Sequence, residues 1–307
     1  MCTSRFFLLH GGPVERRSAG AQLARRRLGT SLRRLREDAN IRIDAAAREL
    51  ECSTAKISRL ENGLGPAKLW DVRILLDLYG MQDPNTRQRF EQWAKESKST
   101  GWWESDADLT TDDLDRYLAI ETDARRLRIF CAPQVPSQLQ TPAYARAHIA
   151  ALHPTWTEAD VARFADMRTA RRTALLDLDD PTEIQAIVDE GALLRRVGGR
   201  HVHAEQLEWL AATLDEFEAA NRTNLQFQVL PFSAGSGRAI SSLTIFDPRQ
   251  SAIDPPIAHL EDWFGASWAE GKEVERFIEV FTATAAQALD PQQSRQLLDE
   301  ILRAAMQ

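Results

Sequence analysis

The sequence predicts a mostly α protein with a second, α+β domain. Apolar residues recur at helical spacing through 21–98, two strand-like runs at 183–190 and 225–232 flank a helical segment, and charge is divided unevenly along the chain. A chain of 307 residues is long enough for two domains with separate cores. We expect a flexible basic arm over 1–20, a helical domain over 21–98, and an α+β domain over 99–307.

The charge distribution indicates which part of the chain meets a polyanion. The formal net charge is −7, yet residues 1–75 hold fifteen Lys or Arg against eight Asp or Glu, a net of +7. The remaining residues therefore carry −14. We expect the basic part to approach phosphates, while the acidic part limits indiscriminate binding to polyanions.

Composition excludes several classes of protein. No apolar run approaches the roughly 20 residues that a membrane helix requires, and the opening run MCTSRFFLLHGG lacks the pattern of a secretory signal. We therefore expect a cytoplasmic protein with no membrane partner. The cysteines Cys2, Cys52 and Cys131 are too scattered for a disulfide framework or a zinc site, so we expect reduced thiols and no metal or cofactor.

The arm, residues 1–20, contains Gly11, Gly12 and Pro13 with little periodicity, which predicts poor order. Arginines within and beyond it fit either contacts with the DNA backbone or minor groove, or a solvated basic face. These are Arg16, Arg17, Arg25, Arg26 and Arg27.

The stretch from Asp44 to Gly63, DAAARELECSTAKISRLENG, predicts two short helices joined by a tight turn. We expect the helices over 42–50 and 54–61, with apolar side chains along the seam between them. The small residues Ala46 and Ala47 permit a close crossing. This is the arrangement of a helix-turn-helix DNA reader.

Three further segments complete the helical domain. Leucines at helical spacing predict a helix over 21–38, and the run after Pro66 predicts another over 69–80 that closes the core. Asp83 and Pro84 then open a helix over 86–97, which is expected to turn Phe90 and Trp93 inward.

Position along the helix-turn-helix assigns candidate DNA contacts, although each side chain could equally lie on the surface without touching DNA. Ser53 is placed to cap the second short helix. Residues on that helix's first turns and outer face are the candidate base readers: Thr54, Ala55, Lys56, Ser58 and Arg59. Residues at helix ends and in loops are the candidate phosphate contacts: Arg42, Ser53, Asn62 and Lys68.

The segment from Leu28 to Gly80 resembles the DNA-binding domain of the xenobiotic-response-element (XRE, Cro/repressor-like) regulators, most closely in KISRLENG and LLDLYG. The resemblance implies a five-helix, lambda-repressor-like domain. One departure is Glu51, which stands where such motifs usually carry Gly in a left-handed turn. That conformation costs a non-glycine residue roughly 1 kcal/mol, so we expect a reshaped turn.

The second domain begins near Trp102 and Trp103, which either anchor the linker on the core or stack on bases or a ligand. Helices are expected over 111–127, 142–152 and 158–176.

A strand over 183–190, a helix over 204–220 and a strand over 225–232 predict one right-handed βαβ unit with parallel strands. The segments SSLTIFD and PPIAHLEDW are expected as strands at the sheet edge. Helices over 273–289 and 294–306 end the chain. The first has an apolar stripe that either covers the sheet or forms a dimer or partner surface. The stripe consists of Val274, Phe277, Ile278 and Phe281.

A second resemblance covers this domain. RYLAIETDARRLRIFCAPQVPSQLQTPAYARAHI, MRTARRTALL, IVDEGALLRRVGG and LQFQVLPFSAG resemble the C-terminal domain of the actinomycete WhiJ-like regulators. The chain departs from that pattern at Ser137, Gln138 and Arg172. The resemblance implies transcription regulation, often together with a small protein encoded beside the regulator, in an arrangement compared to toxin and antitoxin pairs.

Other patterns give weaker signals of chemistry. His201, His203 and Glu205 alternate in a loop entering a helix, without a second cluster to complete a metal site. SAGSGR, residues 233–238, is expected as a surface hairpin loop, and no G-x-S-x-G elbow is present. Four charged residues at the end of the first parallel strand form either a ligand pocket or an ion-pair network. They are Asp189, Glu190, Arg195 and Arg196.

We therefore expect a sequence-specific DNA-binding transcription regulator, with repression as the default. A homodimer would bind an inverted repeat in double-stranded DNA, under control of a small partner protein or small-molecule effector that binds the second domain. The alternative is an antitoxin-like interaction module whose main role is to bind a small protein encoded nearby. An enzyme fused to a DNA reader, with Asp189 or Glu190 in its active site, is the third class.

Overall fold

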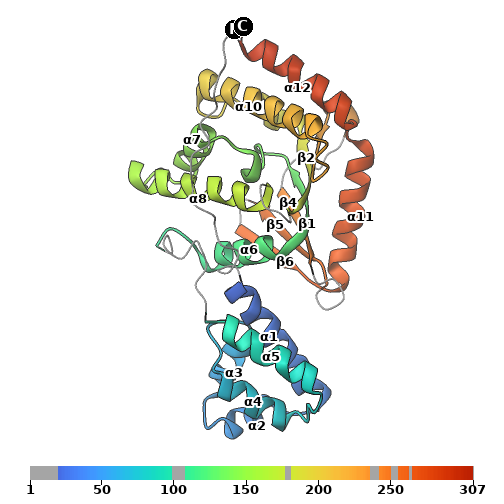
Figure 1. Cartoon of the computed structure of the whole chain (residues 1–307). Helices are drawn as coiled ribbons and strands as arrows, with labels where there is room; N and C mark the ends of the chain where they lie inside the picture. Colours follow the sequence, from blue (N-terminus) through green and yellow to red (C-terminus); the bar gives the residue numbers. More distant parts are fainter. Residues whose placement is uncertain are drawn as a thin grey trace.

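The computed structural model describes most of the chain, in six ranges: 20–98, 108–176, 181–235, 242–249, 255–262 and 265–306 (Figure 1). Residues 1–19 of the predicted arm, with Arg16 and Arg17, lie outside the described residues, as do the pair Trp102 and Trp103 and the second half of SAGSGR.

The N-terminal part is helical, as predicted. Its helices are α1 (Gly20–Asp38), α2 (Ile43–Glu49), α3 (Thr54–Glu61), α4 (Leu69–Leu78) and α5 (Pro84–Glu96). Their apolar faces meet in one core that includes Leu28, Leu32, Ile57, Leu75 and Trp93, each nearly or fully buried. The helical spacing of these residues therefore determines how the short helices α2 and α3 are held against α1 and α4.

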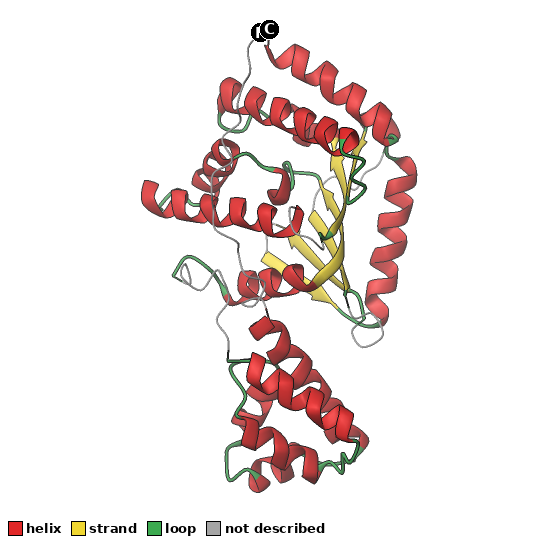
Figure 2. Ribbon diagram, viewed as in Figure 1, coloured by secondary structure: helices red, strands yellow, loops and turns green. Residues whose placement is uncertain are grey.

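A six-stranded mixed sheet organises the second part (Figure 2). Its strands are β1 (Ala124–Cys131), β2 (Glu183–Asp189), β3 (Leu225–Leu230), β4 (Ser242–Pro248), β5 (Ile257–Asp262) and β6 (Gly265–Ala269). They lie in the order β3-β2-β1-β4-β5-β6, with the first three parallel and the remaining pairs antiparallel. The predicted parallel pairing of β2 and β3 is confirmed.

Helices surround this sheet. They are α6 (Asp112–Asp123), α7 (Pro142–Leu152), α8 (Glu158–Leu176), α9 (Glu190–Leu194), α10 (Gly199–Ala219), α11 (Lys272–Gln287) and α12 (Pro291–Met306), with short 3-10 turns at Ser137–Leu139 and Phe232–Ala234. None of the helices that the structure describes is long and apolar enough to cross a membrane.

Two expectations for the sheet were wrong. The helix expected over 111–127 ends at Asp123, because the chain becomes β1, in which Leu127 and Ile129 alternate with polar residues and bury against the core. The segments expected at the sheet edge are interior: β4 lies between β1 and β5, and the short strand β6, not predicted, forms that edge.

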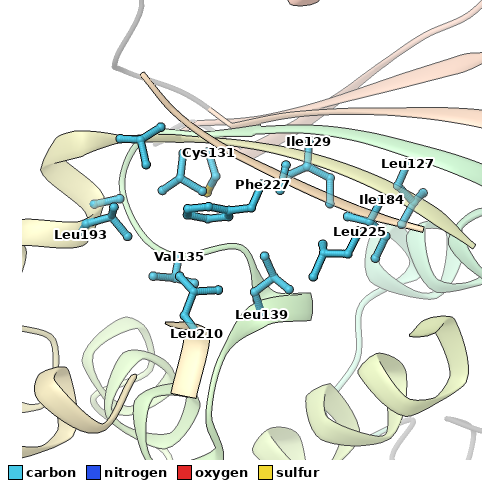
Figure 3. Packing of buried hydrophobic residues seen from close by; sticks show 14 of the residues in the cluster. Leu127, Ile129, Cys131, Val135, Leu139, Ile184, Leu193, Leu210, Leu225 and Phe227 are labelled. Carbon is cyan, nitrogen blue, oxygen red and sulfur yellow. The ribbon is translucent and has the colours of Figure 1, made fainter. Parts of the chain in front are cut away.

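The two faces of the sheet bury separate cores. On one face, Leu127, Ile129 and Phe227 pack with residues of α10 and α12 (Figure 3). On the other face, α11 lies along the sheet (Figure 1) and buries Val274 and Phe281 against it. The interpretation that this apolar stripe covers the sheet is therefore confirmed.

Candidate nucleic-acid interface

Local hydrogen bonds define both ends of α3. The Lys56 amide donates to the Ser53 hydroxyl at 3.2 Å, so Ser53 caps the helix as predicted. At the other end, the amides of Gly63 and Leu64 donate to the carbonyls of Leu60 and Arg59 at 3.1 and 2.8 Å. These two hydrogen bonds form a Schellman motif, in which the residue after the helix is left-handed. That residue is Gly63, with φ +70°.

The turn between α2 and α3 is also a Schellman motif, but it has Glu51 in place of the left-handed glycine. Glu51 has φ +47°, and its amide donates to the Arg48 carbonyl at 3.0 Å. The Cys52 amide donates to the Ala47 carbonyl at 2.9 Å. The expected reshaping of the turn is therefore wrong, because Glu51 adopts the left-handed conformation at a cost of roughly 1 kcal/mol.

Buried contacts fix the inner face of α3. Ile57 is fully buried, and the buried Glu61 accepts two hydrogen bonds from Arg36 of α1, at 2.7 and 2.9 Å. These hydrogen bonds raise the pKa of Arg36. At Gly29 of α1, an added Cβ would lie 2.5 Å from the Leu60 carbonyl oxygen, so only glycine permits this approach. These contacts hold α3 in place through its buried face.

The outer face of α3 carries the predicted base readers. Thr54, Ala55, Lys56 and Arg59 are exposed, and Ser58 is half-buried. The structure thus brings these five onto one accessible surface, but Lys56 also has a partner within the domain. Its ammonium lies 2.7 Å from the carboxylate of Asp71 on α4, and this hydrogen bond raises the pKa of Lys56.

The predicted phosphate contacts lie around α3. Ser53 and Asn62 stand at its two ends, where Ser53 acts as a cap and the Asn62 amide donates to the Ser58 hydroxyl at 3.3 Å. Arg42 is exposed and lies 3.1 Å from Asp44. Lys68 is exposed at the start of α4 and makes no capping hydrogen bond through its side chain. Their contact with DNA stays a prediction.

A cavity of about 870 Å³ lies between the helix-turn-helix and α6, where arginines from both parts of the chain gather. The arginines lining it are Arg25, Arg26, Arg33, Arg59 and Arg116. Two of them share one carboxylate: Arg26 and Arg116 each donate to the same oxygen of Glu270, at 2.6 and 2.7 Å. We call it the interdomain cavity. The residues that line it are far apart in sequence, so no local sequence pattern could have indicated it.

The residues predicted for a ligand pocket at the end of β2 have other contacts. The Asp189 carboxylate accepts the Gly191 amide at 2.8 Å, and Glu190 accepts the Phe232 amide at 2.7 Å. Arg195 and Arg196 are exposed. None of these four lines the interdomain cavity, and a ligand at this position stays a prediction.

The expected loop position of the two histidines was wrong, since both lie inside α10. His203 is buried, and its Nε2 lies 2.7 Å from the Leu193 carbonyl, a contact within the core. Among the described residues, no group of three or more His, Cys, Asp or Glu is placed to hold a metal ion.

Comparison with protein families assigns both parts of the chain. Residues 27–90 match the family model described as a helix-turn-helix domain, which supports the reading of α2 and α3 given above. Residues 114–300 match the family described as a domain of unknown function, DUF5753. Comparison with curated proteins and with solved structures gave no match. Because the second match covers more than half of the chain, the protein belongs to the DUF5753 family and carries a helix-turn-helix domain ahead of that domain.

Proposed function

We propose that the protein is a sequence-specific transcription regulator that inserts α3 into the major groove of double-stranded DNA. The observation that carries this proposal is the contrast between the two faces of α3. Its inner face is fixed by Ile57 and the Arg36–Glu61 pair, whereas its outer face leaves four of five candidate base readers exposed. A rigid helix with an open polar face is what groove recognition requires.

The proposal includes the finer features expected from the sequence. The protein acts in the cytoplasm as a homodimer on an inverted repeat, with α3 of each copy about one helical turn, roughly 34 Å, from its mate. It represses transcription, and it has no enzymatic activity. Helices α1 to α5 make up a five-helix domain that ends near residue 98, preceded by the basic arm.

The second domain is proposed to control DNA binding in response to a small partner protein or a small ligand, as in the WhiJ-like regulators that the sequence resembles. The ion pairs of Arg26 and Arg116 with Glu270 connect α1 to the segment after β6, so a change in the second domain can reach the DNA reader. No contact among the described residues favours the antitoxin-like module as the main role.

Genome-wide mapping of bound DNA tests the proposal. The wild-type chain is expected to occupy discrete sites that share an inverted repeat. A variant with Thr54, Lys56 and Arg59 changed to Ala, a surface change that leaves the core intact, is expected to lose them. Occupancy that is scattered without a shared sequence, or unchanged in the variant, would contradict the proposal. If a small gene lies beside this one, as the resemblance implies, repeating the map without it tests the partner, and unchanged occupancy would contradict its role.

A further inference from the structure

A second cavity, of about 330 Å³, lies inside the α+β domain and contains none of the residues discussed so far as DNA contacts. Side chains of α6, α7 and α8 line one side of it, and residues of β1, β4 and β5 line the other. Its volume falls at the lower end of the range for small-molecule pockets, roughly 300 to 1,000 Å³. We call it the domain cavity.

Aromatic side chains form part of the wall of the domain cavity. The Trp156 ring stacks on His153 with 3.9 Å between ring centroids, and its edge meets Phe164 at 5.4 Å. Leu152 belongs to the same lining and remains 55% exposed. An apolar or aromatic ligand body would cover this surface and gain the free energy of its burial.

A guanidinium that forms no ion pair within the described part of the chain also lines this cavity. Arg168 of α8 donates to the Gln140 side chain at 3.0 Å and lies 3.3 Å from His148 Nδ1, and it forms no ion pair with a described residue. Arg171, one turn further along α8, is instead paired with Glu121 through two hydrogen bonds of 2.8 and 2.7 Å. Burial and the nearby Arg171 lower the pKa of Arg168 to about 10. Glu261, in the same lining, acts on this charge only from a distance, so Arg168 lacks the hydrogen-bonded carboxylate that Arg171 has.

A buried nitrogen in the lining has only one long polar contact with the residues that the structure describes. His259 of β5 is 6% exposed, and its Nε2 lies 3.5 Å from the Asp113 carboxylate without forming a hydrogen bond. Buried polar atoms are normally satisfied, so an orphan in a cavity wall indicates a missing partner. The lining thus offers a cation beside an aromatic wall, because the Arg168 guanidinium lies over the Phe164 ring, 5.5 Å from its centroid.

We propose that the domain cavity binds a small molecule that carries one carboxylate and an aromatic or apolar body. The guanidinium of Arg168 has the planar geometry that pairs with a carboxylate through two parallel hydrogen bonds. The ring stacks on the wall formed by Trp156 and Phe164. The site follows from the geometry of the cavity, whereas its role as an effector site rests on the proposed function.

A chain of contacts connects this cavity to the DNA reader. Asp113 lines both cavities and accepts a hydrogen bond from the Trp268 indole at 2.5 Å. Arg116 lies over the Trp268 ring, 4.2 Å from its centroid, and shares Glu270 with Arg26 of α1. A ligand that binds one arrangement of Asp113 better than another would therefore shift the ion pairs that hold α1.

Titration calorimetry of the full chain without DNA tests the site. The probes are benzoate, phenylacetate and indole-3-acetate, with phenylacetamide as the uncharged isostere of phenylacetate. We expect at least one acid to bind and phenylacetamide to bind at least about tenfold more weakly than phenylacetate, since the charge-assisted hydrogen bonds are lost. Failure of all three acids at millimolar concentration, or equal binding of the amide and the acid, would overturn the proposal.

Variants locate the binding. Arg168→Gln is expected to weaken the acid at least about tenfold, and Arg168→Lys, which keeps the charge without the planar fork, to weaken it less. The matched control is Arg163→Gln on the same helix, because Arg163 pairs with Asp108 and does not line the cavity. Equal affinities of Arg168→Gln and Arg163→Gln would overturn the assignment. The thermal midpoint of each variant, measured without ligand, separates lost binding from lost folding.

The same samples distinguish this proposal from the proposed function. If an acid binds but no DNA duplex binds, the cavity assignment stands and the proposed function as a DNA-binding regulator fails. If DNA binds but no acid does, only the cavity assignment fails. If both bind, the acid is expected to change the affinity for DNA, and Glu270→Gln, which replaces the shared carboxylate, is expected to reduce that change.

Discussion

The ammonium of Lys56, on the exposed face of α3, lies 2.7 Å from the carboxylate of Asp71 on α4. The Lys56 side chain is 45% exposed and that of Asp71 only 15%, so the carboxylate holds the lysine back from the surface that would face DNA. Contact of Lys56 with a base would compete with this ion pair. Loss of this partly exposed ion pair would cost about 0.2 to 1 kcal/mol, which reduces the free energy gained from a base contact by Lys56.

Asp71→Asn is expected to tighten binding to DNA by about threefold, since Lys56 is released and a negative charge near the phosphates is removed. Fluorescence anisotropy with a cognate and a random duplex measures the change. The gain should be smaller in the double variant Lys56→Ala with Asp71→Asn, compared with Lys56→Ala alone, because only the loss of the negative charge then remains. Weaker binding by Asp71→Asn would show that Asp71 itself contacts DNA.

Arg59→Ala is expected to cost about 1 to 3 kcal/mol at the cognate site and to relax specificity at one base pair, because a bidentate contact with a guanine is lost. The contrasting variant is Lys68→Ala, which should weaken binding to every sequence and reduce the salt slope by about one unit. Competition titrations over a range of salt concentrations separate the two effects. Equal losses for Arg59→Ala on cognate and random DNA would remove Arg59 from the base readers.

Gly29→Ala is expected to lower the free energy of unfolding of the helix-turn-helix domain by about 1 to 3 kcal/mol, because the new methyl group would overlap the carbonyl oxygens of Leu60 and Glu61. Urea denaturation followed by circular dichroism measures the loss. The neighbouring change Thr30→Ala, at an exposed position of the same helix, is the control. Equal stability of the two variants would contradict the close approach of α1 and α3.

Burial, followed by the charge of Arg168, lowers the pKa of His148 to about 4 from its ordinary 6.5. Between these values the unfolded chain binds a proton that the folded chain does not, so stability falls as pH decreases from about 6.5 to about 4. The loss from His148 reaches up to about 3 kcal/mol and levels off below pH 4. Above pH 6.5 both states are neutral, and this contribution to the pH dependence vanishes.

Chemical denaturation at a series of pH values tests this dependence. His148→Gln keeps a hydrogen-bond acceptor for Arg168 but does not titrate, so its stability should fall less steeply over the same range. Because His153 and His259 also have lowered pKa values, the difference between wild type and variant is the quantity to compare. Parallel curves for the two proteins would contradict the assignment to His148.

Local patterns were enough to place α3 and β2. The capping residue Ser53 and the apolar spacing predicted the position of α3, and β-branched residues predicted that of β2. The strand β1 was missed because its arginines resemble the solvated face of a helix. Arg128 lies in the sheet because Asp247 of β4, far along the chain, accepts its hydrogen bonds. The alternation of Leu127 and Ile129 with polar residues was the signal that could have indicated a strand.

The accessibility of the candidate DNA readers could be predicted for the same reason, since all five lie on one short helix outside its apolar positions, such as Ile57. The domain cavity could not. Arg168, Trp156 and His259 lie on different elements and meet only when α8 packs against the sheet. Nothing in the run MRTARRTALL distinguishes Arg168, which forms no ion pair with a described residue, from Arg171, which does.

Selection of DNA from a pool of random duplexes tests most directly whether α3 reads sequence. The full chain is expected to enrich one motif arranged as an inverted repeat, with half-sites about one helical turn apart. The variant with Thr54, Lys56 and Arg59 changed to Ala should enrich nothing. Failure of the wild-type chain to enrich any motif at low salt, or enrichment of the same motif by the variant, would contradict DNA recognition by α3.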